Sequence, residues 1–372
     1  MRNKKSKIYL AYPWKFPDSS YYKNILEHPP KDIEYINYSK SHRKRIEIIG
    51  SNNTFEYVRR FKNLLRKILN FIQMPNLKYN PFLECDIIHC AHCLSLNKKP
   101  WVVDTEVYDR VSAGGNIAYS KLGKTIIKNR LRSKYCKRII AWSEDCKKTF
   151  EEVFSGDDEI LRKIIILPFA LQPQKFKRTP HKNIQLLFVA RWFDAKGGRQ
   201  TLEVFDRLTK KYKNVSATFV CPTTESFKIK YLKNEKIKIL DLMPQEKLFD
   251  EIYPAHDIFV YPGFGDSYGF AMPEAMAFGL PIVTVDSFAR REIVKDGKTG
   301  FVIERPKSYS GYDCMDKKML DELVNKTSLL IENRDLRNQL GKNGIKEVKN
   351  GLFSIERRND ILRKIYLEAL SS

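Results

Sequence analysis

A glycine-rich segment at residues 257–286, DIFVYPGFGDSYGFAMPEAMAFGLPIVTVD, carries residues suited to binding a phosphorylated ligand. An apolar strand leads into a loop with Gly263, Gly265 and Gly269, and a helix is predicted from about residue 272 to 278. Glycines before a helix N-terminus let backbone N–H groups approach an anion, which the helix dipole also favours. We therefore expect phosphate binding here, with backbone donors around Gly269, Phe270 and Ala271.

Two acids of this segment lie eight residues apart. Asp266 falls in the loop and Glu274 on the first turns of the predicted helix. Both can therefore contact one ligand, each at a different position along it. Carboxylates that accept hydrogen bonds from sugar hydroxyls suit such positions. The alternative is a plain strand–turn–helix unit, in which the glycines only make the bend and Glu274 is a solvated helix residue.

A second segment, LLFVARWFDAKGGRQTLEVFDRL at residues 186–208, carries two cations between a strand and a helix. Arg191 ends the predicted strand, and Lys196 and Gly197 stand in the loop after it. Open α/β sheets bind ligands at the carboxyl ends of their strands. A guanidinium and an ammonium there would neutralise a diphosphate. The alternative is that these two cations are ordinary surface residues, because the chain has 67 Lys and Arg residues. For either cation taken alone, that alternative is favoured.

These segments must be positioned by a framework in which short apolar runs alternate with amphipathic helical patterns. Strand and helix alternating in both halves of the chain predict an α/β fold with two parallel, doubly wound sheets. The predicted strands are Ile8–Ala11, Ile46–Ile49, Ile87–Cys90, Trp101–Val103 and Ile139–Trp142, then Leu186–Val189, Ala217–Val220, Lys238–Leu240, Ile258–Tyr261 and Ile282–Val285.

The chain of 372 residues is long enough for two domains. We expect an N-terminal domain over residues 1–170, a linker at 171–181 and a C-terminal domain over 182–352. The linker, LQPQKFKRTPH, is polar and has two prolines. Residues 353–372 predict an amphipathic helix capped by Ser354, with one apolar side. That side is formed by Ile355, Leu362, Ile365, Tyr366 and Ala369.

Together the two segments resemble the retaining glycosyltransferases of family 4, which have the GT-B fold of two facing Rossmann-like domains. In that family the Arg and Lys-Gly positions bind the donor diphosphate, which implies this role for Arg191, Lys196 and Gly197. The family's E-x7-E motif places its first acid near the transferred sugar and its second on the nucleotide ribose. Asp266 and Glu274 stand at that spacing.

The resemblance is specific over residues 186–301 and looser at Ile139–Glu144 and Ile166–Phe176. It also includes the final helix, which in the family crosses back to the first domain. It implies a GT-B enzyme that moves a sugar from a nucleotide-sugar donor, most often a UDP- or GDP-sugar, to a glycan or lipid-linked acceptor. Anomeric configuration would be retained, without a metal or a separate cofactor.

The chain departs from the family pattern at three places. Asp266 stands where the family usually has Glu, so its carboxylate is one methylene shorter. The loop after the first strand has no glycine, and Ser19 and Ser20 are its candidate hydrogen-bond donors. Glu106 occupies the place of a family histidine, and we expect it to be a second polar contact or a base near the acceptor.

Asp104 and Glu106 also allow a different interpretation. An apolar strand followed by acid-x-acid is how a metal-dependent GT-A glycosyltransferase holds its divalent ion and nucleotide diphosphate. The cations of the C-terminal half supply phosphate ligands without a metal, which favours GT-B. A second metal alternative is the cluster Cys85, His89, Cys90, His92 and Cys93, whose ligands zinc prefers. Alternate strand residues point to opposite faces, so core cysteines are favoured there and no metal site is assigned.

The net charge of +23 indicates a polyanionic partner. Residues 55–72 predict a basic amphipathic helix, and residues 121–138 a second basic stretch. An anionic membrane surface holding a lipid-linked acceptor is one such partner. A nucleic-acid- or membrane-binding module without catalysis is the rival, although nucleic acid is disfavoured because RNP aromatics, zinc-finger spacing and a basic zipper are missing.

The location of the protein is predicted from its seven cysteines and its hydropathy. Seven is an odd number that does not indicate a disulfide framework, so a reducing compartment is expected. No apolar stretch approaches the roughly 20 residues that a spanning helix needs. The sequence therefore predicts a cytoplasmic enzyme, with any membrane contact peripheral and on the inner face of the cytoplasmic membrane.

Overall fold

The structure is a computed structural model whose described residues form two compact units. Unit 1 combines Met1–Phe169 with Arg358–Ser372, and unit 2 is Ala170–Arg357. The strand predicted at 46–49 and the basic helix predicted at 55–72 lie outside the described residues. The structure describes residues 5–11, 19–36, 74–80, 82–112, 115–309 and 311–371.

Unit 1 is built on a parallel sheet in the order β2-β1-β4-β6-β7-β8. The central strands β4 and β6 are buried along their whole length, as expected for a parallel sheet covered on both faces. A separate two-stranded sheet pairs β3 with β5. The strands are β1 (Ser6–Ala11), β2 (Ile33–Tyr35), β3 (Leu77–Lys78), β4 (Ile87–Ala91), β5 (Leu94–Ser95), β6 (Trp101–Thr105), β7 (Cys136–Ala141) and β8 (Ile164–Ile166).

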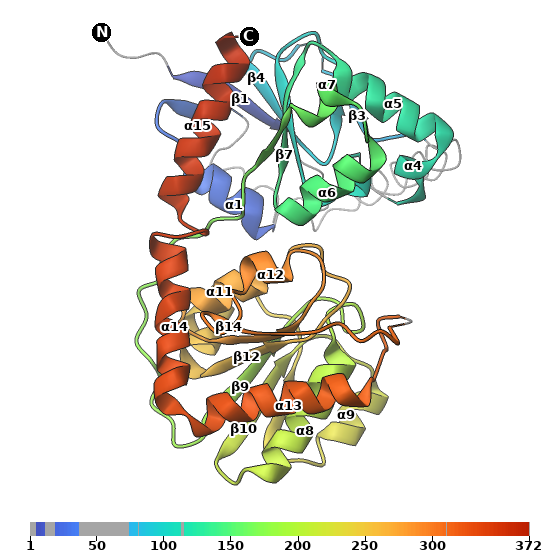
Figure 1. Ribbon diagram of the computed structural model, residues 1–372. Coiled ribbons are helices and arrows are strands. Elements are labelled where there is room, and N and C mark those ends of the chain that lie inside the picture. Colours follow the sequence, from blue (N-terminus) through green and yellow to red (C-terminus); the bar gives the residue numbers. More distant parts are fainter. Residues whose placement is uncertain are drawn as a thin grey trace, which may run out of the picture. The chain divides into compact units, whose positions relative to one another are not determined.

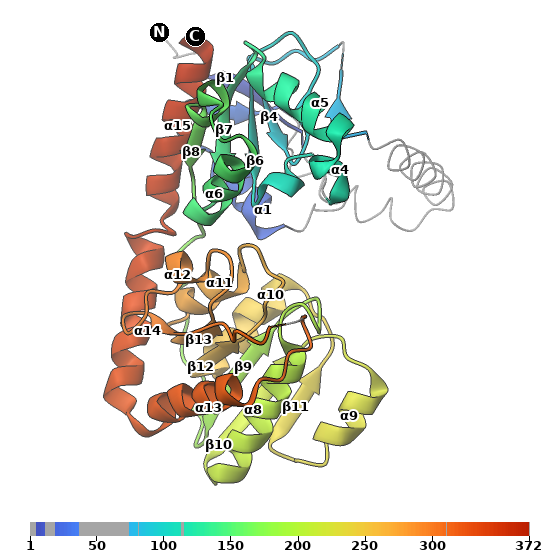
Figure 2. The same cartoon turned by 45° about the vertical axis from the view of Figure 1, so that its right-hand side comes forward.

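Helices cover the sheet of unit 1 on two sides, with α15 on one side and α5 on the other (Figures 1 and 2). Ser143 caps α6 and Ser120 caps α5, each accepting a backbone N–H from the first turn of its helix. The helices are α1 (Ser20–Glu27), α4 (Asn116–Tyr119), α5 (Lys121–Arg132), α6 (Glu144–Val153), α7 (Asp158–Leu161) and α15 (Ile355–Ser371), with a 3-10 turn η1 (Tyr108–Arg110).

The C-terminal helix α15 is joined to unit 1 by a buried polar chain as well as by its apolar side. The Tyr366 hydroxyl lies 2.6 Å from His89 Nδ1 and 3.0 Å from the Tyr35 hydroxyl. His89 Nε2 lies 2.9 Å from Asp104 Oδ2, and the Tyr22 hydroxyl donates to Asp104 Oδ1 at 2.7 Å. All five side chains are buried. Because each polar group has a partner, burying them is tolerated and the helix is held in one register.

Replacing Tyr366 with phenylalanine should destabilise the protein by about 1–3 kcal/mol, because a buried His89 nitrogen loses its partner. The measurement is the midpoint of urea unfolding. Tyr119→Phe is the matched control, since the Tyr119 side chain is 58% exposed. A control of this kind should change stability by less than about 0.5 kcal/mol. Equal midpoints for the two variants would show that the polar chain does not stabilise α15.

Unit 2 is a parallel sheet in the order β11-β10-β9-β12-β13-β14. Strands β12 and β13 consist only of buried residues, so their continuous apolar runs match their central positions. The strands are β9 (Ile184–Val189), β10 (Val215–Val220), β11 (Ile237–Leu240), β12 (Ile258–Tyr261), β13 (Ile282–Val285) and β14 (Gly300–Ile303).

The helices of unit 2 lie on both faces of its sheet. Helices α8 and α13 pack together on one face, and α11 and α12 lie on the other, as Figure 1 shows. The helices are α8 (Gly198–Lys211), α9 (Glu225–Tyr231), α10 (Gln245–Lys247), α11 (Ala271–Ala277), α12 (Arg290–Ile293), α13 (Lys317–Glu332) and α14 (Arg334–Lys349). A π turn η2 (Leu248–Ile252) and a 3-10 turn η3 (Tyr253–Ala255) follow α10.

Nine of the ten predicted strands fall within the described residues, and each coincides with a strand to within three residues at either end. Strands β2, β3, β5, β8 and β14 were not predicted. The first four have two or three residues each, too short for a hydrophobic period to stand out. In the part of the chain that the structure describes, no helix has the length and apolar character needed to cross a membrane.

Candidate functional site

The sheet of unit 2 reverses its strand order at one place. Numbered along the chain from β9, its strands lie in the order 3-2-1-4-5-6, so successive connections leave β9 and β12 toward opposite faces. The loops after these neighbouring strands, 190–197 and 262–270, both lie at this switch point, where open α/β sheets bind ligands. They are the two segments in which the sequence predicts a diphosphate site.

The two loops touch through their backbones. The Gly265 N–H donates to the Ala195 carbonyl at 2.8 Å. A Cβ at Gly263 would lie 2.3 Å from the carbonyl carbon of Lys196, so no side chain fits there. Gly197 has φ +80°, a left-handed conformation that favours glycine. The cation-bearing loop and the glycine-rich loop therefore form one corner of the sheet.

Lys196 and Asp266 meet across this corner. The Lys196 ammonium forms an ion pair with Asp266 Oδ1 and lies 3.4 Å from the Gly265 carbonyl oxygen. The other carboxylate oxygen, Asp266 Oδ2, accepts a 2.7 Å hydrogen bond from the Tyr261 hydroxyl at the end of β12. Their side chains are 16% and 10% exposed, so the pair keeps an edge open to solvent.

A second cation, Arg290, lies near the other carboxylate oxygen of Asp266. Its Nη2 lies 3.6 Å from Asp266 Oδ2, and its guanidinium stands over the Tyr261 ring at 5.2 Å. The Arg290 side chain is fully buried, whereas its neighbour Arg291 is 48% exposed. The sequence alone does not single out Arg290, because two adjacent arginines look alike without the tertiary structure.

The electrostatics of the corner keep Asp266 ionised. Burial alone raises the pKa of the Asp266 carboxyl, but the charges of Lys196 and Arg290 and the hydrogen bonds to it bring the net pKa below its usual value. Burial and the neighbouring Asp266 raise the pKa of Tyr261 well above its usual value, so this phenol stays protonated and donates. Two cations and one carboxylate leave an excess positive charge suited to an anionic ligand.

Glu274 lies on α11, which begins one residue earlier than predicted. The residue is buried, and the Gln245 side-chain amide donates to its Oε1 at 2.7 Å. The Tyr253 hydroxyl donates to its Oε2 at 3.2 Å, and burial beside Glu274 raises the pKa of Tyr253 so that it remains a donor. Both oxygens of the Glu274 carboxylate are thus held by side-chain donors.

The remaining predicted donor-site residues flank this corner. Arg191 is exposed just beyond β9 and forms no ion pair with any described residue. Gly269 has φ +88°, and a Cβ there would lie 2.9 Å from Asp266 Oδ2. Phe270 and Ala271 stand at the start of α11. The structure thus brings Lys196 and Gly197 to the loop that carries Asp266 and Gly269.

Unit 1 contains the predicted acceptor-side residue. Glu106 is partly exposed and follows the carboxyl end of β6. The metal alternative at Asp104 is wrong. Asp104 is fully buried, and its two oxygens are bonded to Tyr22 and His89, so it cannot face a nucleotide. His89 uses both ring nitrogens in the same polar chain, and Cys85, Cys90 and Cys93 belong to the hydrophobic core of unit 1.

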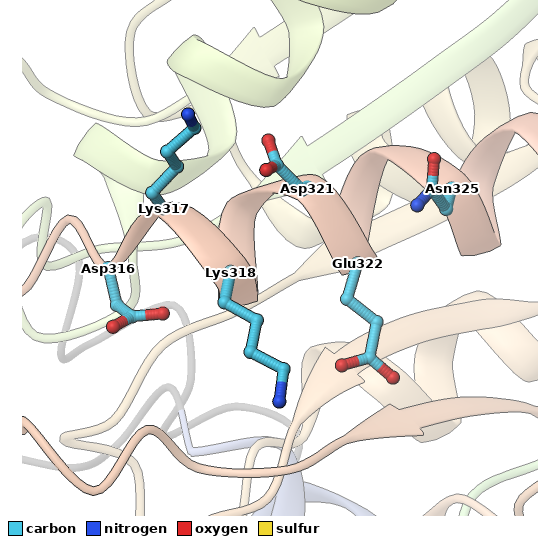
Figure 3. Close-up of a pocket in the computed structure, with 6 residues that line it drawn as sticks. All are labelled: Asp316, Lys317, Lys318, Asp321, Glu322 and Asn325. Carbon is cyan, nitrogen blue, oxygen red and sulfur yellow. The ribbon is translucent and has the colours of Figure 1, made fainter.

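An open depression along α13 is a separate surface feature (Figure 3). The side chains of Lys317 and Lys318 point to different sides of the helix. Asp316 caps the helix, and Asp321 pairs with Arg207. These groups do not converge on a common point, so the depression does not form a binding or catalytic site. Its lining residues are Asp316, Lys317, Lys318, Asp321, Glu322 and Asn325.

The sequence of unit 2 is similar to that of a known protein family. Residues 172–347 match the family model described as glycosyl transferases group 1. Unit 2 therefore resembles group 1 glycosyl transferases in sequence. The matched range includes both loops at the switch point and the residues that form the corner, Lys196, Asp266 and Arg290. The predicted family is thereby supported at the level of group 1.

Relatives among curated proteins are also glycosyltransferases. The chain is 28% identical over 212 residues to an uncharacterized glycosyltransferase of Haemophilus influenzae, covering 55% of this chain and 54% of the relative. It is 25% identical over 196 residues to the capsular polysaccharide biosynthesis glycosyltransferase CapM of Staphylococcus aureus, covering 50% and 48%. The chain thus spans about half the length of these relatives.

A solved structure shows the same fold across both units. The crystal structure of Anabaena HepE in complex with UDP and glucose matches with a TM-score of 0.62 and 14% identity, covering 97% of this chain and 98% of that chain. At this identity the likeness concerns the fold alone. It confirms the predicted fold class, GT-B, with two Rossmann-like domains built on parallel sheets.

Proposed function

We propose that this protein is a glycosyltransferase that moves a sugar from a nucleotide-sugar donor to a glycan or lipid-linked acceptor with retention of anomeric configuration. The observation that carries the proposal is the corner formed by Lys196 and Asp266 at the switch point of unit 2. The match to group 1 glycosyl transferases over the same residues supports it. UDP and glucose in the structure of HepE make UDP-sugars the first donors to test.

In this mechanism the donor diphosphate lies against Lys196 and Arg191. When the bond between the sugar and the diphosphate breaks, negative charge grows on the leaving phosphate, and the two cations stabilise it. Backbone N–H groups around Gly269, Phe270 and Ala271 add donors at the same place. Cations fixed before the reaction are most effective, since they need not reorganise as the charge develops.

Two acids orient the rest of the donor. Glu274 accepts hydrogen bonds from the ribose hydroxyls, for which Gln245 and Tyr253 hold its carboxylate. Asp266 orients the transferred sugar through its hydroxyls, from the open edge of the Lys196 ion pair. Because Asp266 stays ionised, it acts as an acceptor and not as an acid. Its short side chain restricts which hydroxyl it reaches.

The acceptor is assigned to unit 1. Glu106 follows β6 and would contact the acceptor or take the proton of its hydroxyl. A lipid-linked acceptor is suggested by the basic helix α5, where Leu122 is 48% exposed beside the exposed Lys121 and Lys124. Apolar and cationic side chains together favour an anionic lipid surface. Sedimentation with anionic liposomes at low salt tests this part, and protein left in the supernatant would remove it.

A donor screen tests the function as a whole. UDP-, GDP- and ADP-sugars are added in turn and thermal unfolding is followed. One base should raise the midpoint selectively, since a ligand at 100 times its dissociation constant stabilises the fold by about 2.7 kcal/mol. Release of the nucleoside diphosphate from that donor should then persist in EDTA, because Lys196 and Arg191 supply the positive charge. No shift with any nucleotide, together with salt-sensitive nucleic-acid binding, would favour a binding module instead.

A further inference from the structure

The guanidinium of Arg290 joins the two ends of the loop that carries Asp266. Its Nη1 donates to the Tyr268 carbonyl at 3.1 Å, and its Nη2 donates to the Gly263 carbonyl at 3.2 Å. Gly263 follows β12 and Tyr268 precedes α11, so one side chain on α12 spans the loop between them. A single planar group with several donors is suited to such bridging, whereas a lysine ammonium is not.

The loop is closed tightly onto this guanidinium. A Cβ at Gly269 would lie 2.7 Å from Arg290 Nη1, so the backbone must run directly past the charge. Asp266 lies between the two bridged carbonyls in the sequence, and its Oδ2 is 3.6 Å from Arg290 Nη2. The position of the carboxylate is therefore set by Arg290 near its Oδ2 and by Lys196 at its Oδ1.

Stability alone is a poor explanation for this arrangement. A buried ion pair gives little net stabilisation, because the cost of removing two charges from water offsets their attraction. An apolar side chain of similar volume can be equally stable in such a place. Arg290 has no exposed surface at all and still retains two carbonyl bonds and a carboxylate neighbour. Its effect is to fix one loop conformation and one carboxylate orientation.

We propose that Arg290 is a positioning residue of the donor site, which bridges the ends of the 262–270 loop and orients the Asp266 carboxylate toward Lys196. This inference rests on the proposed function, because it assigns Arg290 to the site where the donor would bind. Arg290 itself is fully buried and does not touch the donor. It acts through Asp266 and through the backbone on either side of that residue.

Arg290 should also affect the pH dependence of the enzyme. The groups that face Asp266 are Lys196 from the β9–α8 loop, Arg290 from α12 and Tyr261 from β12. Against the effect of burial, Lys196 and Arg290 lower the pKa of Asp266. At pH values above the unfolded-state pKa of Asp266, the ionised carboxylate therefore stabilises the folded protein. This stabilisation is lost as the pH falls through the lower folded-state pKa. Removing Arg290 raises the folded-state pKa and moves the acid limb of kcat/KM to higher pH.

The test compares Arg290→Met, Arg290→Lys and Arg291→Met in the full chain. Arg290→Met should lower kcat by about 10- to 100-fold, similar to the loss when a supporting partner of a metal ligand is removed. The acid limb of the kcat/KM profile of this variant should shift to higher pH. Arg290→Lys keeps the charge but not the bridge, so kcat should fall while the acid limb stays near that of the wild type. Arg291→Met, which loses only exposed pairs with Asp286 and Glu304, should match the wild type.

Three measurements separate the possible outcomes. Thermal unfolding identifies variants that fail to fold, and nucleotide binding reports on the donor site without activity. If the wild type binds no nucleotide, the proposed function fails. If it binds and turns over, but Arg290→Lys has wild-type kcat, the bridging role is wrong, whether or not Arg290→Met folds. An unchanged acid limb in a folded Arg290→Met variant would equally overturn the proposal.

Discussion

Lys196→Ala should lower kcat/KM for the nucleotide-sugar donor by about 10²- to 10³-fold, the loss expected when one group that stabilises developing charge is removed. Lys196 is the cation held at the open edge of the corner, where its ammonium pairs with Asp266 and contacts the Gly265 carbonyl. In the proposed mechanism the diphosphate would then lose one of its two cations, Lys196 and Arg191. Affinity for the nucleoside diphosphate should fall together with turnover, because the same charge acts in the bound state and in the transition state.

Isothermal titration with the nucleoside diphosphate and the initial rate of its release from the donor measure these two effects. Lys210→Ala is the matched control. Lys210 lies near the C-terminal end of α8, the helix that follows the same loop, and is 70% exposed in a pair with Asp206. It should behave as the wild type, since exposed ion pairs contribute little. If both lysine variants bind nucleotide equally well, Lys196 does not contact the diphosphate.

Unlike Lys196→Ala, Asp266→Asn should lower turnover without weakening nucleotide binding. The amide keeps the size of the side chain but removes the charge, so Lys196 and Arg290 no longer share their positive charge with a carboxylate. Nucleoside diphosphate affinity should be unchanged or slightly stronger. Turnover should fall by about 100-fold, because the neutral amide accepts only weak hydrogen bonds from the sugar hydroxyls.

Single-turnover rates and nucleotide titrations on the same protein separate the two effects for Asp266. Asp321→Asn serves as the control, since Asp321 is 50% exposed on α13 and pairs with Arg207. Normal turnover in Asp266→Asn would exclude an acceptor role for the carboxylate. A loss of nucleotide binding as large as in Lys196→Ala would instead mean that Asp266 acts mainly by holding Lys196 in place.

The C-terminal helix illustrates what a sequence pattern leaves undetermined. Its apolar side was predicted, and Leu362, Ile365, Tyr366 and Ala369 are indeed buried. Arg358 is buried as well, with its guanidinium donating to the carbonyls of Asn24 and His28. Hydropathy alone places such a residue at the surface. Its partners lie more than 300 positions away in the sequence, so only the folded chain brings them together.

The metal alternatives illustrate a related point. Asp104 with Glu106, and His89 with its neighbouring cysteines, are ligand types at suggestive spacings, but ligands are defined by where their lone pairs point. Asp104 and His89 are on adjacent strands β6 and β4, and their side chains turn to each other in the core. Tyr22 and Tyr366, from helices at distant parts of the chain, complete the hydrogen bonds. Burial together with these partners decided the role of both residues.

By itself, the sequence determined the alternation of strands and helices and the positions of Lys196 and Asp266 just after two of those strands. Both follow from local chemistry, since apolar runs define parallel strands and glycines define the loops between them. Only the tertiary structure decided that β9 and β12 are neighbours, which joins the two loops in one corner. It also decided that Arg290 and not Arg291 faces Asp266, because the direction of a side chain depends on how α12 packs.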